Sequence, residues 1–233
     1  MDERLIETIV NQVAERLLAG RNVKSDAGSD LVTDEIRAGI VLVNISARHI
    51  HLTSDHVEQL FGKGAQLKPM RSLHQPGEFA SEQQVLLVGQ AGRTLGPVRV
   101  LGPVRKASQV EISLTDCYTL GLKQLPPIRP SGDHTGTFGI TMVGSAGAVT
   151  LNSGLIRANR HVHLHTTQAE AMGLRNGDRV DVRLDGERPA IFLGCQIRAH
   201  EAFRGEMHID TDDGNAVGIK SGAKAQILLQ GRH

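Results

Sequence analysis

An internal repeat constrains the fold of this chain more than any other feature of its sequence. Ser46-Ala-Arg-His-Ile-His-Leu52 matches Ala158-Asn-Arg-His-Val-His-Leu164, and each copy follows an apolar run and precedes a short helical segment. Downstream of the two copies, Gln109-Val-Glu-Ile-Ser113 aligns with Glu206-Met-His-Ile-Asp210. The chain is therefore expected to contain two similar units related by duplication.

The regular structure predicted for these units is mainly β. From Ile40 onward, short strand-like runs alternate with Gly and Pro, a pattern typical of small barrels and sandwiches. Residues 100–106 (VLGPVRK) align with residues 192–198 (FLGCQIR), so both units are expected to carry the same strand here. Residues 172–182 (MGLRNGDRVDV) resemble the helix-turn-strand segment of double-psi β-barrels. We predict two tandem duplicated β-barrels, double-psi-like, with a few short helices.

The N-terminal segment differs in character from the rest of the chain. Residues 1–20 predict a detached amphipathic helix, because apolar residues recur at helical spacing, and the polar residues 21–37 predict a linker. The Pro- and Gly-rich segment 126–139 is the strongest internal break. We predict a first barrel over 38–128 and a second over 129–233. The apolar stripe of the helix must pack on its own domain, on a second copy of the chain or on another protein; a membrane surface is the least favoured alternative, because the polar face carries acids as well as bases.

Composition excludes several classes of protein. Aromatic residues make up 3% of the chain, with no Trp, and the net charge is +1. Binding to single-stranded nucleic acid relies on aromatic stacking and basic grooves, so we expect no nucleic-acid partner. No apolar run approaches the roughly 20 residues of a membrane span, and no secretory signal is evident, so no membrane association is expected. Two cysteines cannot build a disulfide framework and fit a reducing bacterial cytoplasm.

The repeated histidines predict metal binding. His49 and His51, like His161 and His163, are two residues apart, and in a strand such residues point to the same face. Two imidazoles so placed can hold one Zn²⁺ ion. The aligned position downstream supplies a third ligand in each unit, Glu111 in the first and His208 in the second. The sequence thus predicts two three-ligand sites, each with an open coordination position.

A single His-x-His motif is more often two polar residues on a strand, and it is the matched second copy that favours metal. The remaining histidines lack this symmetry and are expected to be surface residues or to lie behind the ligands. These are His56, His74, His134, His165, His200 and His233. Cys117 and Cys195 are expected to be core thiols, because neither lies in a recognisable nucleophile motif.

Arginines near the same strands are candidates for anion binding. Arg105 lies shortly before Glu111, and Arg99 and Arg71 lie further upstream. A guanidinium group binds phosphate in a bidentate manner, and we assign this role to Arg105 first. The sequence contains no phosphate-binding loop, no G-x-S-x-G nucleophile elbow and no dinucleotide-binding glycine motif.

These motifs together resemble the PduL-type phosphate propanoyltransferases of bacterial microcompartments. The resemblance runs from about residue 38 to residue 230. It is carried by residues 46–52, 102–106, 109–113, 160–164 and 207–216. The N-terminal helix also resembles the encapsulation peptide with which that family enters the compartment.

The resemblance implies an enzyme that interconverts acyl-CoA plus phosphate with acyl phosphate plus CoA, using two Zn²⁺ ions per chain. It implies that His49, His51 and Glu111 hold one ion, that His161, His163 and His208 hold the other, and that Arg105 binds phosphate. The expected coenzyme A contacts are Ser46, Arg99, Leu101, Asn215 and, in a more variable stretch, Arg71. We also expect a homo-oligomer inside a microcompartment, with the N-terminal helix contacting shell or cargo proteins.

The expected chemistry is attack of phosphate on the thioester carbonyl, with CoA leaving as a thiolate. Zn²⁺ accepts sulfur readily, so the Glu111 site is assigned to the CoA sulfur and the three-histidine site, with Arg105, to phosphate. Two alternatives remain open at this point. The same ligands could serve a two-metal hydrolase of a phosphorylated or thioester substrate, or the chain could be a non-catalytic compartment scaffold.

Overall fold

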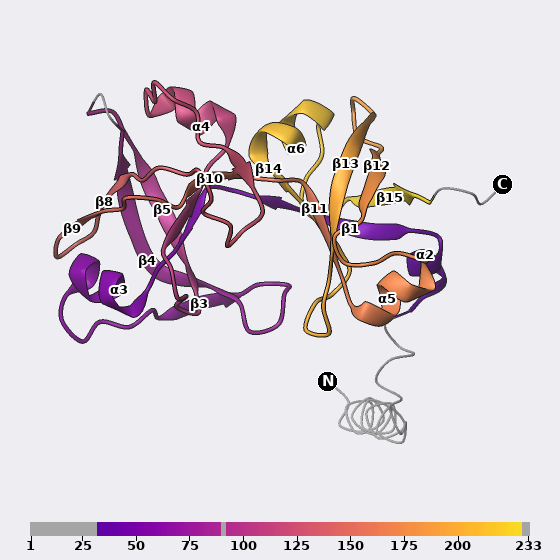
Figure 1. Cartoon of the computed structure of the whole chain (residues 1–233), viewed down its shortest axis with the longest axis horizontal. Coiled ribbons are helices and arrows are strands. Elements are labelled where there is room, and N and C mark those ends of the chain that lie inside the picture. Colours follow the sequence, from indigo (N-terminus) through magenta and orange to yellow (C-terminus); the bar gives the residue numbers. More distant parts are fainter. Residues whose placement is uncertain (1–31, 90–91, 230–233) are drawn as a thin grey trace, which may run out of the picture.

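The computed structural model describes residues 32–89 and 92–229, which form two β-rich lobes side by side along the long axis (Figure 1). The predicted helix over 1–20 and most of the linker over 21–37 lie outside the described residues. The end of that linker is helical: Thr33 caps α2 (Asp34–Arg37), and Ile36 is buried against the adjacent barrel. The sequence Thr-Asp-Glu supplies the cap and acids of a helix N-terminus, a signal that the linker interpretation overlooked.

One sheet closes into a six-stranded barrel. Its strands, in order around the ring, are β1 (Ile40–Ser46), β14 (Glu206–Asp210), β11 (His161–Leu164), β13 (Ala190–Ala199), β12 (Arg179–Leu184) and β15 (Lys224–Leu228). Valine, isoleucine and leucine side chains on alternate positions fill its interior, and Val162, Met207 and Ile227 are fully buried. The mainly-β class is confirmed.

In the second sheet the histidine strand again lies between two partners, as in the barrel, but the sheet stays open. Its strands run in the order β7 (Ile128–Arg129), β10 (Leu155–Ala158), β6 (Gln109–Glu111), β2 (His49–His51), β5 (Thr94–Gly102), β4 (Phe79–Val88), β8 (Thr141–Val143) and β9 (Ala148–Thr150), with β3 (Pro69–Ser72) beside β4. In the barrel, β15 pairs with β1 and closes the ring. In the second sheet the two end strands, β7 and β9, are not paired with each other, so this sheet is a half-barrel rather than a second closed barrel.

The remaining helices are short and connect the strands. They are α3 (Ser54–Phe61), α4 (Leu114–Thr119), α5 (Thr166–Ala171) and α6 (Thr211–Val217). The helices α3 and α5 each follow a histidine strand, as the repeat predicts. No helix among the described residues is both long enough and apolar enough to span a membrane.

The two lobes exchange a strand, which the division of the sequence into halves does not anticipate. Strand β1 precedes the first histidine motif, yet it pairs with β14 in the barrel, with Asn44 beside His208. Strand β10 precedes the second motif, yet it pairs with β6, with Ile156 beside Glu111. Figure 1 shows the indigo β1 among the orange and yellow strands of the barrel. The expected boundary after residue 128 therefore does not separate the strands of the two sheets, since β8, β9 and β10 also follow it.

Strand pairing confirms the repeat around the histidines and corrects it elsewhere. His49 lies opposite Glu111, and His161 lies opposite His208, as aligned. The alignment of residues 100–106 with 192–198 is wrong. Val100 pairs with Ile50, and Ile197 pairs with the equivalent Val162, so Val100 corresponds to Ile197 and not to Phe192. The shared Leu-Gly letters caused the error: in β13 that glycine has φ +65° and sits where the pairing with β12 shifts register.

Both cysteines are buried core residues, as predicted. Cys117 packs in the core of the open sheet and Cys195 in the barrel. Burial raises the pKa of each thiol to about 11. Because the thiolate is the reactive form, neither cysteine is suited to act as a nucleophile near neutral pH.

Candidate active site

One cavity of about 510 Å³ lies where the two sheets meet, and residues from both line it. Only two residues separate each histidine strand from the exchanged strand before it, β2 from β1 and β11 from β10. These short crossings bring the two histidine motifs to the junction of the lobes. All six predicted metal ligands line this single cavity.

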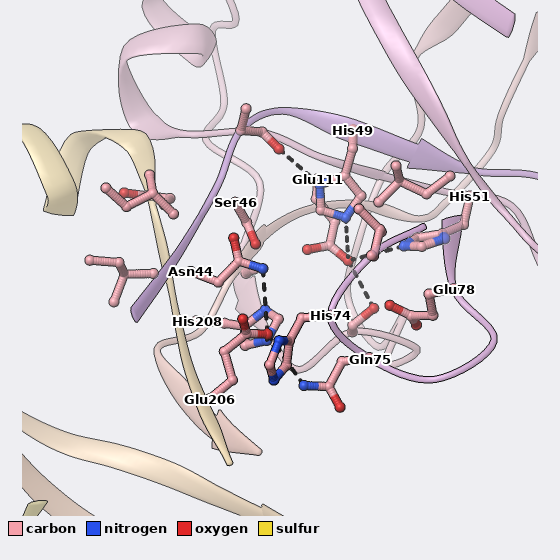
Figure 2. A pocket seen from close by; sticks show the side chains of 18 of the residues that line it. Asn44, Ser46, His49, His51, His74, Gln75, Glu78, Glu111, Glu206 and His208 are labelled. Carbon is pink, nitrogen blue, oxygen red and sulfur yellow. Dashed lines mark hydrogen bonds and ion pairs between the residues drawn. The ribbon is translucent and has the colours of Figure 1, made fainter. Parts of the chain in front are cut away.

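The first cluster consists of His49 and His51 on β2 and Glu111 on β6. Its potential ligand atoms all lie within 4.8 Å of one another. Oε1 of Glu111 is 3.6 Å from Nε2 of His49 and 4.0 Å from Nε2 of His51, and Figure 2 shows the three side chains converging. The cluster has the donor types and the separation of a His-His-carboxylate metal site.

The second cluster consists of His161 and His163 on β11 and His208 on β14. The ring centroids are 4.8 Å apart for His161 and His163, 4.9 Å for His161 and His208, and 4.6 Å for His163 and His208. The rings of His161 and His208 are stacked at 18°, and Nε2 of His208 is turned to within 2.8 Å of Oε2 of Glu206. Three nitrogens can converge on one ion here only if these rings rotate.

The first histidine of each motif is held in the same way. Nδ1 of His49 lies 2.9 Å from the carbonyl oxygen of Ala47, and Nδ1 of His161 lies 2.9 Å from that of Asn159. A carbonyl oxygen can only accept, so Nδ1 carries the proton in both rings and Nε2 keeps its lone pair. Protein metal sites orient their histidines by this kind of contact.

Buried polar atoms provide a direct test of whether the residues fit a metal. Nδ1 of His51 and both ring nitrogens of His163 are buried and have no hydrogen-bond partner in the protein. A buried polar atom left unpaired costs about 1–3 kcal/mol, so such atoms normally have a ligand or bound water. The donor set of the first cluster fits a bound transition-metal ion as it stands, and the unpaired nitrogens of His163 leave the second cluster free to bind one after its rings rotate.

Electrostatics differ between the two clusters. Burial opposes protonation of His49, but the facing Glu111 carboxylate outweighs it and raises the pKa of His49. Burial alone would raise the pKa of Glu111, yet His49 and His51 hold it well below its ordinary range. In the second cluster, burial and then the neighbouring His208 lower the pKa of His161 to about 3 and that of His163 further. His161 and His163 therefore favour the neutral form, in which a ring nitrogen has a lone pair free to bind a metal.

Arg105 lies beside the Glu111 cluster and is fixed by hydrogen bonds. Its Nη1 donates to Oγ of Ser131 at 3.0 Å, and Ser131 in turn donates to Oε1 of Glu111 at 2.8 Å. Gln109 donates to the same Glu111 oxygen at 2.6 Å. Glu78 forms a half-exposed ion pair with Arg105 at 3.5 Å, so a carboxylate occupies the position that an anionic substrate would take.

Two acidic side chains and a glutamine that the motifs did not identify also line the cavity. Glu206 accepts from Nδ2 of Asn44 at 3.5 Å and from Nε2 of Gln75 at 3.3 Å, and Figure 2 shows it next to His208. Gln75 and Glu78 belong to the loop between β3 and β4, which crosses from the open sheet to the barrel. Of these three, only Glu206 could have been found from the sequence. It lies two residues before His208, as Gln109 lies two residues before Glu111, so it is expected on the same face of its strand.

Each histidine motif is also tied to the helix that follows its third ligand. Arg48 contacts the buried Asp116 of α4 at 2.8 Å, and Arg160 forms a bidentate pair with Asp213 of α6 at 2.8 and 2.6 Å. The two pairs occupy equivalent positions of the repeat. They hold each His-x-His strand in position relative to the strand that carries its third ligand.

Four of the five predicted coenzyme A contacts line the cavity, namely Ser46, Arg71, Arg99 and Leu101. Arg99 is anchored through Nη1 to the carbonyl oxygens of Ser81 and Glu82, whereas Arg71 is exposed. Asn215 is exposed on α6 and is not among the residues lining this cavity. Of the other histidines, His74 lines the cavity, and His134 contacts Gln109 from behind at 3.2 Å. His233 lies outside the described residues.

The fold and the site define a mainly-β enzyme whose duplicated histidine clusters share one cavity at the junction of two lobes. Comparison with known proteins identifies its family. The family model of phosphate propanoyltransferase matches residues 42–220, and this chain belongs to that family. It is accordingly a phosphate acyltransferase.

Named relatives match over most of their length. The phosphate propanoyltransferase of Planctopirus limnophila is 42% identical over 96% of this chain and 90% of its own. That of Lachnoclostridium phytofermentans is 50% identical over 81% and 87%. That of Thermotoga maritima is 44% identical over 81% and 89%.

Proposed function

We propose that this chain exchanges a short acyl group between coenzyme A and phosphate, in the cavity between its lobes, with two Zn²⁺ ions bound. The observation that carries the proposal is the pair of three-ligand clusters lining one cavity. His49, His51 and Glu111 would hold one ion, and His161, His163 and His208 the other. When bound, such ions supply Lewis acidity toward oxygen and sulfur.

The reaction needs no protein nucleophile. A phosphate oxygen bonds to the thioester carbonyl carbon, the carbon–sulfur bond breaks, and the electron pair leaves with sulfur as the CoA thiolate. The role of the chain is to desolvate and orient two anionic reactants. Both cysteine thiols are buried with a raised pKa, which supports direct transfer over a covalent enzyme intermediate.

Arg105 is the proposed phosphate ligand in the first lobe. Its guanidinium group lines the cavity and is held by Ser131, so its planar donors are already oriented. Ser46, Arg99 and Leu101 line the same cavity and are the proposed coenzyme A contacts, with Arg71 at its exposed rim. Asn215 stays a proposed contact from the family resemblance alone.

The N-terminal residues 1–20 are proposed to recruit the enzyme to a bacterial microcompartment by contacting shell or cargo proteins. The family resemblance and the apolar stripe in the sequence support this assignment.

The test is an acyl-phosphate plus CoA assay on purified protein, followed by absorbance of the thioester bond, with metal analysis of the same sample. The proposal expects thioester formation that requires both CoA and metal. Release of free acid and phosphate at the same rate with CoA omitted would instead identify a two-metal hydrolase. Absence of both reactions in metal-replete protein would indicate a scaffold.

A further inference from the structure

Arg198 is a second half-buried arginine of the cavity, in the barrel lobe. It lies near the end of β13 and pairs in register with His163 of the three-histidine cluster. It lines the same cavity as Arg105. The corresponding position in the other lobe, paired with His51, is Leu101, so this guanidinium group is not a feature of the repeat.

The charge of Arg198 is not paired with a carboxylate in the described part of the chain. Among the described residues, no carboxylate forms an ion pair with it, whereas Arg105 has Glu78. It makes a cation–π contact with Phe203, with the guanidinium carbon 5.8 Å from the ring centroid. Burial, only partly offset by Glu111, lowers the pKa of Arg198. Carboxylates line the cavity, but none of those described forms an ion pair with Arg198, so its guanidinium group can still bind an anion there.

Arg198 is held in place by the three-histidine cluster itself. Phe203 stacks on His163 with 4.1 Å between ring centroids, and Arg198 lies over the same Phe203 ring. The positive charge of Arg198 contributes to lowering the pKa of both His161 and His163, so it lies close to that cluster. Arg105 acts in the same way on His49 and His51. Each lobe thus places one guanidinium group beside its own histidine cluster.

We propose that Arg198 binds the phosphate that accepts the acyl group, so that phosphate is held between Arg198 of the barrel and Arg105 of the open sheet. The inference rests on the proposed function of the same cavity and adds a second phosphate-binding residue to it. It also revises the sequence-based assignment, in which Arg105 alone served the three-histidine site. The anion meant here is inorganic phosphate or the phosphate of the acyl phosphate, not the phosphates of coenzyme A.

The experiment compares Arg198→Met, Arg198→Lys and the control Arg183→Met in the full chain, after metal analysis. Arg183 is an exposed arginine of the same barrel, paired with Asp185 at 2.8 Å. Calorimetry gives the Kd of inorganic phosphate and, separately, of CoA. Loss of a charge-assisted contact should raise the phosphate Kd of Arg198→Met on the order of 10- to 100-fold. Arg198→Lys keeps the charge but loses the planar fork, so its effect should be smaller.

The control and the CoA affinities should change by no more than about twofold, as for a surface position. An unchanged phosphate Kd in Arg198→Met, or an equal loss of CoA affinity, would overturn the proposal. So would loss of bound metal or of the folded state in both Arg198 variants, since that would show a structural role. If only Arg198→Met fails to fold, the phosphate Kd of Arg198→Lys decides.

Turnover of the wild-type enzyme separates this inference from the proposed function. Without acyl transfer between CoA and phosphate in the wild type, the proposed function itself fails. If the wild type turns over and Arg198→Met keeps its KM for phosphate, only the role of Arg198 is disproved.

Discussion

His49 lies directly opposite Glu111 on the antiparallel strands β2 and β6, with 3.6 Å between Nε2 and Oε1. His161 and His208 repeat this relationship on β11 and β14. A ligand at a directly paired position is fixed by the backbone register rather than by a mobile loop. Both clusters are therefore built on paired strands of the sheets, and Ala substitution of one ligand should leave the sheets intact.

Metal content should reflect this independence of the two sites. His49→Ala should lower the stoichiometry from two ions per chain to one. The other cluster keeps its three ligands, because they lie on β11 and β14 and not on the strands of the first cluster. Mass-spectrometric metal analysis of protein purified without chelator measures this directly. The exposed His200 provides the control, and His200→Ala should retain both ions. A wild-type stoichiometry of one or none would refute the two-site assignment.

Substitution of Arg105 should separate the two substrates kinetically. Arg105→Ala removes a charge-assisted contact to phosphate. The ratio of wild-type to variant kcat/KM for phosphate or acyl phosphate should therefore correspond to a loss of roughly 1.5–3 kcal/mol of transition-state stabilisation. The KM for CoA should change much less. Arg129, whose guanidinium group contacts the backbone carbonyl of Thr135, offers a control outside the cavity. An equal rise in both Michaelis constants would exclude Arg105 from the phosphate site.

The ligand set could be predicted from the sequence because strand alternation and repetition are local signals. His49, His51 and their counterparts needed only a spacing of two, and Glu111 and His208 needed only the second copy of the motif. The exchange of β1 and β10 could not be predicted, since neither strand pairs with the strand that comes next along the chain. A short run of apolar residues predicts a strand but does not specify which distant strand it pairs with.

Residues contributed by loops and by misaligned strands were missed for related reasons. Ser131, Gln75 and Glu78 lie in segments without periodicity, and tertiary contacts alone bring them to the cavity. Arg198 was hidden by the false alignment of the Leu-Gly letters, which placed it opposite Lys106. With the observed register, its position two residues after a strand partner of His161 would have marked it as facing the histidine cluster.

Deletion of residues 1–20 should leave catalysis intact. Every proposed ligand and substrate contact lies between Ser46 and Asn215, so turnover and metal content should stay close to those of the full chain. Delivery of a fluorescent fusion to microcompartments should be abolished. Glu substitutions at Ile9 and Val13, in the centre of the predicted apolar stripe, should mimic the deletion. Loss of activity or of the folded state on truncation would instead place the segment in the catalytic domain.

The stability of chelator-treated protein should fall as the pH decreases below about 6.5, the ordinary pKa of histidine. Burial lowers the pKa of His161 to about 3, and the pKa values of His51 and His163 are also lowered. Below the ordinary value the unfolded chain binds protons that the native chain does not. The free energy of unfolding therefore decreases with falling pH.

His49 acts in the opposite direction, and Glu111 reinforces the trend at lower pH. The raised pKa of His49 contributes stability below its ordinary value that is lost as the pH rises through the folded-state pKa. Glu111, with a lowered pKa, contributes stability above about pH 4.3 that is lost as the pH falls. Because three histidines with lowered pKa oppose one with raised pKa, the net loss is expected on the acid side.

Thermal unfolding followed by circular dichroism, from about pH 8 to about pH 4 in the presence of chelator, measures this dependence. His161→Phe removes one buried titrating group and keeps a planar ring in the stack with His208, so its Tm should vary less steeply with pH than that of the wild type. A wild-type Tm that stays constant from about pH 7 to about pH 5 would show that the histidines of the metal-free protein remain free to protonate, and hence that the clusters are open to water.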